Sequence, residues 1–458
     1  MPAPLTRSLG RFAATLTYDD LPARAVEAVK LGFTDCAACM LAGANEPVVR
    51  IVGSTMVRPD RNGEAQILLG RSRANAADAA LLNGVAAHAL DYDDVALSGH
   101  PSVALVPAIL AEAEAVGADG RAAIAAYVAG YETWAHLIAR EPDPYHRKGW
   151  HPTAVLGPLA AAAAVASLRR LNETEATMAI AIAASLSSGL VANFGTMTKP
   201  FHAGRAAASG VTAARLAQAG MTASQDAVEH SVGLLAALSP NGHADREQPL
   251  DDLGRIWRIS EFGLNVKKYP MCYGTHRALD AIMDLVSTHD LKPATVAGVT
   301  TTIGRTQAAM LRNHRPQTGL EAKFSMEFAM ASVLVARRAG LRELTDDFVR
   351  RPDVQSAMEK VTLTFDDHMA ADDPAFSEFD RVEVTLAGGG CLTSPEIRYA
   401  RGHWALPLKD GELWSKFREC AANELGESAT QIAFERLQTL ERQSSLRDLG
   451  QAAARPAA

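Results

Sequence analysis

Apolar residues recur at intervals of three and four along residues 1–265, and Gly, Pro and Asp-Gly interrupt them. Positions three and four apart share one face of a helix, so this spacing predicts a succession of α-helices. The segment 118–140 is typical: Asp119 stands where an N-cap is expected, and Ala123 and Ala126 fall near one face. Much of the apolar content is alanine, whose small side chain lets helices pack closely. We therefore predict a large helical bundle here.

The pattern changes after about residue 290. Segments 296–306 and 360–367 are rich in β-branched residues, which favour strands. Segment 381–402 reads as a hairpin around three consecutive glycines, 388–390, and a helical pattern over 321–340 separates the first two strands. Strands and helices mixed in this way indicate a small α+β unit.

The helical pattern returns at about Asp410, and 458 residues exceed what one hydrophobic core usually supports. We therefore predict a mainly α protein: a large all-helical domain with an inserted smaller α+β lid domain. Residues 1–265, completed by C-terminal helices in 403–458, would form the helical domain, and residues 266–402 the lid. The boundary at 263–268 would act as a hinge.

The composition excludes several classes of protein. A net charge of −7 and a pI near 6.0 give no positive surface for nucleic acid or an anionic membrane. We expect no signal peptide and no membrane span, because no apolar run is long enough. Five cysteines in so long a chain are no disulfide framework, which favours a reducing, cytoplasmic setting. Cys36 and Cys39 form C-x-x-C, but inside an apolar helical run that suits a core better than a metal or redox site.

Four basic or titratable residues stand at the predicted starts of four separate helices. His100 and His151 each precede a proline and a Ser or Thr, and a proline favours the first position of a helix. Lys199 precedes Pro200 in the same way, and His276 lies just ahead of another helix. Helix N-termini bind anions and disfavour imidazolium, so these histidines should be neutral and able to move a proton near pH 7. Lys199 suits a carboxylate clamp better than a Schiff base, which stays possible.

Asp91, Asp93 and Asp94 crowd the end of a predicted helix, where the helix dipole disfavours carboxylates. Our hypothesis is that they face the positive starts of other helices. Asp91 is the best functional candidate, placed to orient a catalytic group, and at least one of the others is expected to be a capping or solvated acid. The competing interpretation is a metal site completed by His88 or His100, although no familiar metal-binding spacing appears.

Five motifs resemble, in order, those of the MmgE/PrpD family: "NGVAAHALDYDDV" with "GHPS", "GWHPTAVLGP", "GTMTKPFHAGRAA", "KKYPMCYGTH" and "EAKFSMEF". That family includes 2-methylcitrate dehydratase, cis-aconitate decarboxylase and iminodisuccinate epimerase. The resemblance implies a large helical domain and a smaller α+β lid with the site in the cleft between them, a homodimer, and no metal or organic cofactor.

The resemblance also implies the site residues. Those with catalytic roles would be Asp91, His100, His151, Lys199 and His276. Those in contact with the substrate would be Ser102, Thr153, Lys268, Tyr273 and Phe328. No metal-binding residues are implied.

Two positions depart from the decarboxylase-like members, which place Thr where this chain has Val95 and tend to carry Tyr where it has Phe328. Each difference removes a hydroxyl, which favours dehydration over decarboxylation. We therefore expect a cofactor-independent lyase of the dehydratase type, acting on a small di- or tricarboxylate by histidine-mediated proton transfer next to a carboxylate. An epimerase or decarboxylase using the same site is the alternative, and a non-catalytic carboxylate-binding protein is the alternative of another class.

Overall fold

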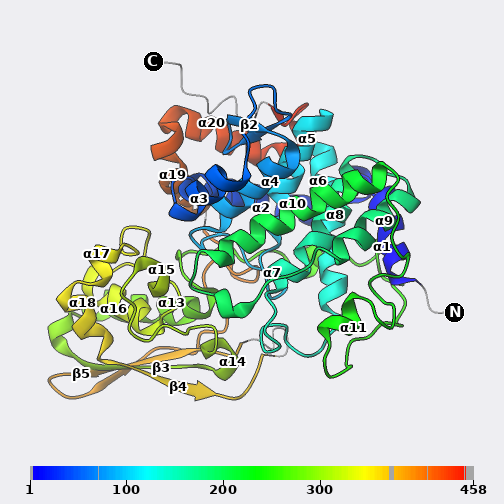
Figure 1. Ribbon diagram of the computed structural model, residues 1–458. Coiled ribbons are helices and arrows are strands. Elements are labelled where there is room, and N and C mark those ends of the chain that lie inside the picture. Colours follow the sequence, from blue (N-terminus) through cyan, green and yellow to red (C-terminus); the bar gives the residue numbers. More distant parts are fainter. Residues whose placement is uncertain (1–3, 71, 371–375, 410, 448, 450–458) are drawn as a thin grey trace.

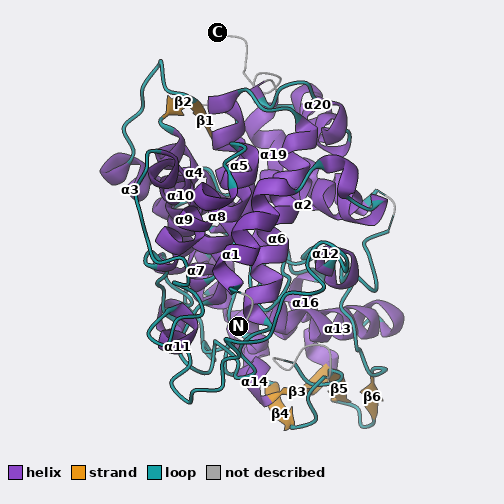
Figure 2. Cartoon of the chain, turned by 90° about the vertical axis from the view of Figure 1, so that its right-hand side faces the viewer, coloured by secondary structure: helices purple, strands orange, loops and turns teal. Residues whose placement is uncertain are grey.

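The computed structural model describes residues 4–70, 72–370, 376–409, 411–447 and 449. These residues are mostly helical, as predicted (Figures 1 and 2). No described helix has the length and apolar character needed to cross a membrane.

The helices up to residue 262 follow the predicted succession. They are α1 (Leu5–Thr15), α2 (Ala23–Ala42), α3 (Pro47–Met56), α4 (Ala76–His88), α5 (Pro101–Val116), α6 (Gly120–Ile138), α7 (Pro152–Val155), α8 (Gly157–Leu168), α9 (Glu173–Ala184), α10 (Thr198–Gln218), α11 (Leu234–Leu238) and α12 (Arg258–Phe262). The expectation that nearly every segment here is helical is wrong in two places. Strands β1 (Ala65–Ile67) and β2 (Ser72–Ala74) pair antiparallel, and much of 219–257 consists of turns.

The second part of the chain mixes helices and strands. Its elements are α13 (His276–His289), β3 (Val296–Gly304), α14 (Arg305–Ala308), α15 (Gly319–Ala322), α16 (Met326–Ala336), α17 (Asp346–Val349), α18 (Pro352–Met358), β4 (Val361–Asp366), β5 (Arg381–Leu386) and β6 (Cys391–Thr393). The chain then ends in α19 (Glu412–Leu425) and α20 (Glu427–Gln438).

The four strands of this part form one sheet in the order β4-β3-β5-β6. β3 is parallel to β4 and antiparallel to β5, and helices lie between β3 and β4 in the chain. Strands β5 and β6 pair antiparallel with Thr385 opposite Cys391, which confirms the hairpin predicted around the three glycines. Helices α13 and α16 pack against the sheet, which lies at one end of the molecule in Figure 2.

The predicted helix starts can be compared one by one. Asp119 caps α6, because its carboxylate accepts a hydrogen bond of 2.8 Å from the N–H of Ala122. His100 and His151 are the N-caps of α5 and α7, each with proline at the first helical position. Lys199 lies in the first turn of α10, one residue after Thr198, which confirms its predicted place at a helix start. His276 opens α13.

Two clusters of buried apolar side chains are present. One draws its members from residues 5–264 and again from 417–449, and the other from residues 269–384. Helices α19 and α20 both contact α2, and Figure 1 shows them beside the blue N-terminal helices. This distribution supports the predicted division into a helical domain completed by the C-terminal helices and a smaller lid, and we retain that division as a proposal.

Helices α4 and α10 approach each other closely through glycine. A Cβ atom on Gly204 would lie 2.2 Å from the carbonyl oxygen of Leu81, and one on Gly84 would lie 2.8 Å from the Cα atom of Gly204. Neither position therefore tolerates a side chain without a backbone shift. The close approach matters for function because α4 ends in His88 and α10 begins beside Lys199, and these two side chains meet at 2.9 Å.

The first prediction concerns this contact. We expect Gly204→Val to lower the free energy of unfolding by about 1–3 kcal/mol, because overpacking forces the two helices apart. Gly388→Ala is the control and should be nearly neutral, since no atom of the described residues lies within 4 Å of its Cβ position. Chemical denaturation of both variants measures the difference, and equal stabilities would contradict the close packing.

Candidate active site

The loop between α4 and α5 turns sharply at the site. Ala96 and Gly99 exchange both backbone hydrogen bonds, at 3.0 and 2.9 Å. Leu97 and Ser98, between them, have φ angles of 49° and 58°, the left-handed values of type I′ turns. Non-glycine residues in this conformation cost about 1–3 kcal/mol each, and such strain clusters at functional sites. The indole N–H of Trp134 donates to the Leu97 carbonyl at 3.2 Å and helps to fix the turn.

A small cavity of about 60 Å³, here called the inner cavity, lies against this loop. Its charged residues and histidines come from four segments of the chain and are Asp91, His100, His146, His151, Lys199 and Lys267. Its other walls include Val95, Ser98, Phe194, Cys272, Tyr273, Met310, Phe324 and Phe376. Four of the five predicted catalytic residues therefore line one cavity.

Asp91 lies buried between two lysines. Its carboxylate forms an ion pair with the ammonium group of Lys199, and the Nζ atom of Lys267 lies 3.0 Å from its Oδ2 atom and 2.6 Å from its backbone oxygen. Burial opposes ionisation, but the two ammonium groups outweigh it and hold the pKa of Asp91 well below its usual range. Two positive charges against one negative charge leave the inner cavity with one unit of positive charge while its histidines are neutral.

Asp93 joins two histidines below the cavity. Its Oδ1 atom lies 2.8 Å from Nδ1 of His88, and its Oδ2 atom lies 2.8 Å from Nδ1 of His100. Burial raises the pKa of Asp93, but the two imidazoles lower it by a larger amount. The pKa of Asp93 therefore lies well below its usual range. An ionised carboxylate can only accept hydrogen bonds, so both Nδ1 atoms carry the proton. The Nε2 atom of His100 is then unprotonated and able to act as a base.

The histidines of the site are neutral. Burial, followed by the charge of Lys199, lowers the pKa of His151 well below its ordinary value, and burial outweighs Asp93 in lowering that of His100. The pKa of His88 falls to about 3 by burial in spite of Asp93. Neutral imidazoles were predicted from helix dipoles, and the structure gives burial as the main cause.

His151 is held from behind by a second histidine. Its Nδ1 atom lies 3.2 Å from Nδ1 of His202, so one ring donates and the other accepts. The ring of Phe194 meets His151 edge-on at 4.9 Å and lies under Lys199 at 5.2 Å. His202 therefore decides which nitrogen of His151 carries a proton.

His276 lies behind the cavity wall. Its Nε2 atom lies 3.3 Å from the carbonyl oxygen of Met271, and its ring contacts those of Tyr269 and Tyr273 at 5.2 and 5.0 Å. Tyr273 itself lines the cavity, as predicted for a substrate-contacting residue. His276 thus supports that wall and is not among the residues that line the inner cavity.

Four other predicted substrate contacts lie elsewhere. Lys268 pairs with Glu412 at 2.8 Å, away from the cavity, because neighbouring side chains of an extended segment point in opposite directions. Phe328 is fully buried in the second core, four residues after Phe324, which does line the cavity. Ser102 bonds to the Tyr127 hydroxyl at 2.7 Å.

Thr153 also acts from outside the cavity. Its hydroxyl accepts a hydrogen bond of 3.1 Å from the backbone N–H of His100. It therefore positions a catalytic candidate and does not line the space where a substrate would bind.

Several residues that line or support the cavity carry no clear signal in the sequence. Lys267 was hidden by its neighbour Lys268, since a Lys-Lys pair does not reveal which side chain turns inward. The sequence pattern indicated His88 only as a possible metal ligand. His146 and His202 do not precede a proline and so carried no helix-start signal, although His202 stands two residues after Pro200 in a motif already noted.

The three aspartates differ from the hypothesis in their partners. All three are buried, so none is a solvated acid. The side-chain partners of Asp91 and Asp93 are ammonium and imidazole groups, and no described helix N-terminus donates to them. Burial and the nearby carboxylate of Asp35 raise the pKa of Asp94 well above its usual range.

A metal ion is the competing use of this cluster. His88, Asp93 and His100 offer ligand atoms within 4.8 Å of one another. However, Nδ1 of His88 is spent on a hydrogen bond to Asp93, and Nδ1 of His100 on one to the backbone oxygen of Asp94 at 3.1 Å. The Lys199 ammonium stands 2.9 Å from Nε2 of His88. A positive charge so close opposes a second cation, and the donor set fits a hydrogen-bonded triad better than a metal centre.

Comparison with known families decides the relationship. The model of the MmgE/PrpD N-terminal domain matches residues 7–247, and that of the MmgE/PrpD C-terminal domain matches residues 269–440. The chain belongs to the MmgE/PrpD family. This result confirms the resemblance drawn from the five motifs.

Three relatives with similar sequences are named as cis-aconitate decarboxylases or as decarboxylase-like. Human cis-aconitate decarboxylase is 28% identical over 360 residues, covering 76% of this chain and 73% of the relative. The cis-aconitate decarboxylase of Aspergillus terreus is 24% identical over 449 residues, covering 93% and 90%. A cis-aconitate decarboxylase-like protein of Aspergillus oryzae is 24% identical over 461 residues, covering 95% and 93%.

The second prediction follows from the buried histidines. Burial lowers the pKa of His276 to about 3, against about 6.5 in an unfolded chain. Between these values the unfolded chain binds the extra proton, so this contribution to stability is complete above pH 6.5 and is lost as the pH falls toward 3. Glu114 and Glu132, whose pKa values burial raises to about 7, oppose the trend in the whole protein.

We therefore expect His276→Gln to flatten the decline of unfolding free energy between pH 6.5 and 4 by up to about 1.4 kcal/mol per pH unit. Denaturation curves recorded at several pH values for both proteins measure this difference. Identical slopes would show that His276 is not held neutral by burial.

Proposed function

We propose that this MmgE/PrpD protein is a lyase that removes a group from a small di- or tricarboxylate, with dehydration as the first candidate reaction. Membership in the family and relatives named for decarboxylation of cis-aconitate support an enzyme that acts on carboxylates. The observation that carries the proposal is the unprotonated Nε2 of His100 beside a buried cavity of net positive charge.

The first step is binding of a carboxylate. Lys199 and Lys267 share one aspartate, so a substrate carboxylate would supply the missing negative charge. Among these buried groups the attraction is stronger than in water. The aromatic rings of Phe194 and Phe324, at 5.2 and 5.6 Å from the Lys199 ammonium, exclude water from it.

The second step is removal of a proton from the carbon next to that carboxylate. The Nε2 atom of His100 accepts the proton, and the carbon retains the electron pair. The ammonium groups stabilise the charge that develops on the carboxylate. Asp93, already paired with Nδ1–H of His100, stabilises the imidazolium that forms.

The third step is departure of the leaving group. The electron pair forms the double bond, and the bond from the neighbouring carbon to its hydroxyl breaks. The His100 imidazolium formed in the second step gives its proton to this hydroxyl, which leaves as water and restores the neutral imidazole. When Nδ1–H of His202 donates to Nδ1 of His151, the Nε2–H of His151 would donate a hydrogen bond to the departing hydroxyl. Val95 lines the cavity and brings no hydroxyl of its own that would compete for the leaving group.

Decarboxylation by the same residues is the second candidate. It is favoured by the name of the relatives, and CO2 would then leave with the carbon–carbon bond broken and the proton returned to carbon. Phe328 does not line the cavity, so the missing tyrosine hydroxyl gives no argument against this reaction. Of the two departures from the decarboxylase-like members, only Val95 remains an argument against decarboxylation.

The proposal includes a reaction without metal or organic cofactor and, by family resemblance, a homodimer. Epimerisation is a further outcome of the same geometry, since His100 and His151 present their rings to the cavity from positions 6.4 Å apart. Proton removal by one and return by the other would invert a centre without expelling a group.

The test is a panel of citrate-, aconitate-, tartrate- and aspartate-like acids, screened by thermal shift and then by NMR in deuterated water. A new double bond from a hydroxy acid supports dehydration, and loss of CO2 supports the second candidate. Deuterium uptake without either change indicates an epimerase. Binding without any chemical change would indicate a carboxylate-binding protein, and loss of turnover with a chelator would overturn the metal-free reaction.

The third prediction concerns His100. On the substrate that the panel identifies, we expect His100→Gln to lower kcat at least about 100-fold, because general acid–base catalysis typically contributes 10²–10⁴. Asp93→Asn should act in the same direction, because it removes the negative charge that stabilises the His100 imidazolium. Circular dichroism controls for folding, and a loss below about tenfold in His100→Gln would remove this residue as the base.

A further inference from the structure

A second, larger space adjoins the inner cavity. It measures about 680 Å³, against about 60 Å³ for the inner cavity, and we call it the vestibule. The two spaces share Ser98, His146, Tyr273 and Phe376 as walls. Because these residues face both spaces, a molecule anchored at the lysines would extend past them into the vestibule.

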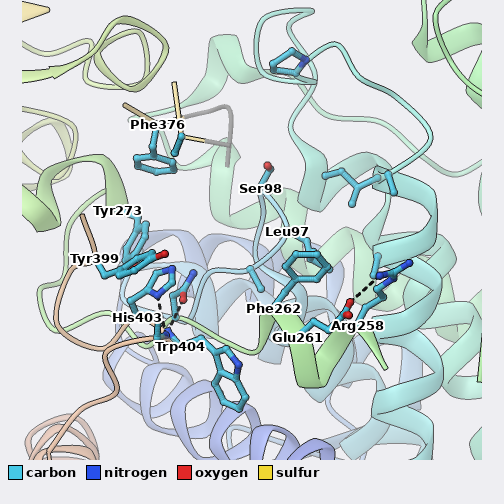
Figure 3. Close-up of a pocket in the computed structure, with 18 of the residues that line it drawn as sticks. Leu97, Ser98, Arg258, Glu261, Phe262, Tyr273, Phe376, Tyr399, His403 and Trp404 are labelled. Atoms are coloured by element: carbon cyan, nitrogen blue, oxygen red, sulfur yellow. Dashed lines mark hydrogen bonds and ion pairs between the residues drawn. The ribbon is translucent and has the colours of Figure 1, made fainter. Parts of the chain in front are cut away.

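The walls of the vestibule are largely aromatic and aliphatic. Figure 3 shows Tyr273, Tyr399 and His403 on one side of the space, with Leu97 and Phe262 on the other. Phe262 is 44% exposed, which is high for a large apolar side chain that could otherwise be buried. Such walls gain free energy by covering an apolar ligand surface.

The vestibule differs from the inner cavity in charge. Among the described residues that line it, the charged ones are Glu141, Arg258, Glu261, Arg277, Glu378 and Arg398. Three arginines and three glutamates cancel, whereas the inner cavity keeps one positive charge. A carboxylate is therefore attracted to the inner cavity and gains nothing comparable in the vestibule.

The arginines of the vestibule already have partners. Arg258 forms an ion pair with Glu261 at 2.7 Å, drawn as a dashed line in Figure 3. Arg277 pairs with Asp380 at 3.0 Å and is mostly buried. Arg398 lies over an aromatic ring of the same wall at 5.4 Å. None of them is positioned as a vacant clamp for a second carboxylate.

We propose that the substrate carries, besides the carboxylate end held in the inner cavity, a bulky uncharged and mainly apolar substituent, aromatic or branched alkyl, that occupies the vestibule. This inference rests on the proposed function, because it takes the inner cavity as the carboxylate site. It adds the chemical nature of the rest of the substrate. With this substituent, the substrate is an acid larger than the small carboxylates considered above.

Three acids that differ only in their tail test the proposal: succinate, 2-methylsuccinate and 2-benzylsuccinate, with affinities measured by calorimetry. A phenyl ring buries a large apolar area, so we expect 2-benzylsuccinate to bind at least about tenfold more tightly than 2-methylsuccinate. The measurement needs no turnover and so does not depend on which lyase reaction occurs.

Variants of the vestibule then test whether the apolar substituent of the acid binds there. Ala139→Trp and Ala405→Trp place an indole into the vestibule from two exposed positions that do not line the inner cavity, and Ala139→Ser is the matched small control. We expect either Trp variant to abolish the preference for the benzyl acid while leaving the affinity for 2-methylsuccinate within about twofold. Ala139→Ser should keep the preference. Lys199→Met should lower the affinity for all three acids.

The outcomes separate the two proposals. Equal affinity for the methyl and benzyl acids, or a preference that survives in both Trp variants, overturns the vestibule proposal and leaves the carboxylate site intact. Absence of binding by all three acids, or binding that Lys199→Met does not change, overturns the carboxylate site and the vestibule proposal with it.

Discussion

The buried ion cluster of Asp91, Lys199 and Lys267 is the interaction on which the site depends. Moving one carboxylate and two ammonium groups out of water is costly, and this cost is offset only when their mutual contacts are good. The three residues come from the loop after α4, the first turn of α10 and the segment that leads to the second core. Their meeting therefore joins the helical core to the α+β part and leaves one positive charge for a ligand.

The polar contacts around Asp93 determine which nitrogen of His100 can accept a proton in this charged pocket. Asp93 and the backbone oxygen of Asp94 lie 2.8 and 3.1 Å from Nδ1 of His100, so the proton stays on the nitrogen that points away from the cavity. His202 plays the corresponding part for His151. A positive site thus lies between two neutral imidazoles whose protons are controlled from outside the cavity. This is the arrangement that proton transfer next to a bound carboxylate requires.

Much of the architecture could be predicted from local rules. Prolines marked the starts of α5 and α7, Asp119 marked the start of α6, and the three glycines marked the hairpin of β5 and β6. These features are set by residues close together in sequence. Strands β1 and β2 were missed because three residues each are too short to show an alternating pattern.

The site was predictable only in part, because its geometry depends on residues far apart in the chain. Periodicity placed His100 and His151 at helix starts, but it could not show that Lys267 turns inward while Lys268 turns out to Glu412. Nor could it show that Phe324, and not Phe328, faces the cavity. Both errors are choices between neighbouring candidates, and tertiary packing decides them.

Adjacent lysines provide the most direct test of the central claim, that excess positive charge in the inner cavity binds the substrate's carboxylate. Glutamine at position 267 keeps N–H donors for Asp91 and removes the charge, whereas Lys268→Gln makes the same change outside the cavity. The affinity for 2-methylsuccinate should fall at least about tenfold in Lys267→Gln and stay within about twofold in Lys268→Gln, since a charged partner is worth about 1.5–3 kcal/mol. Equal affinities in two folded variants would contradict the account.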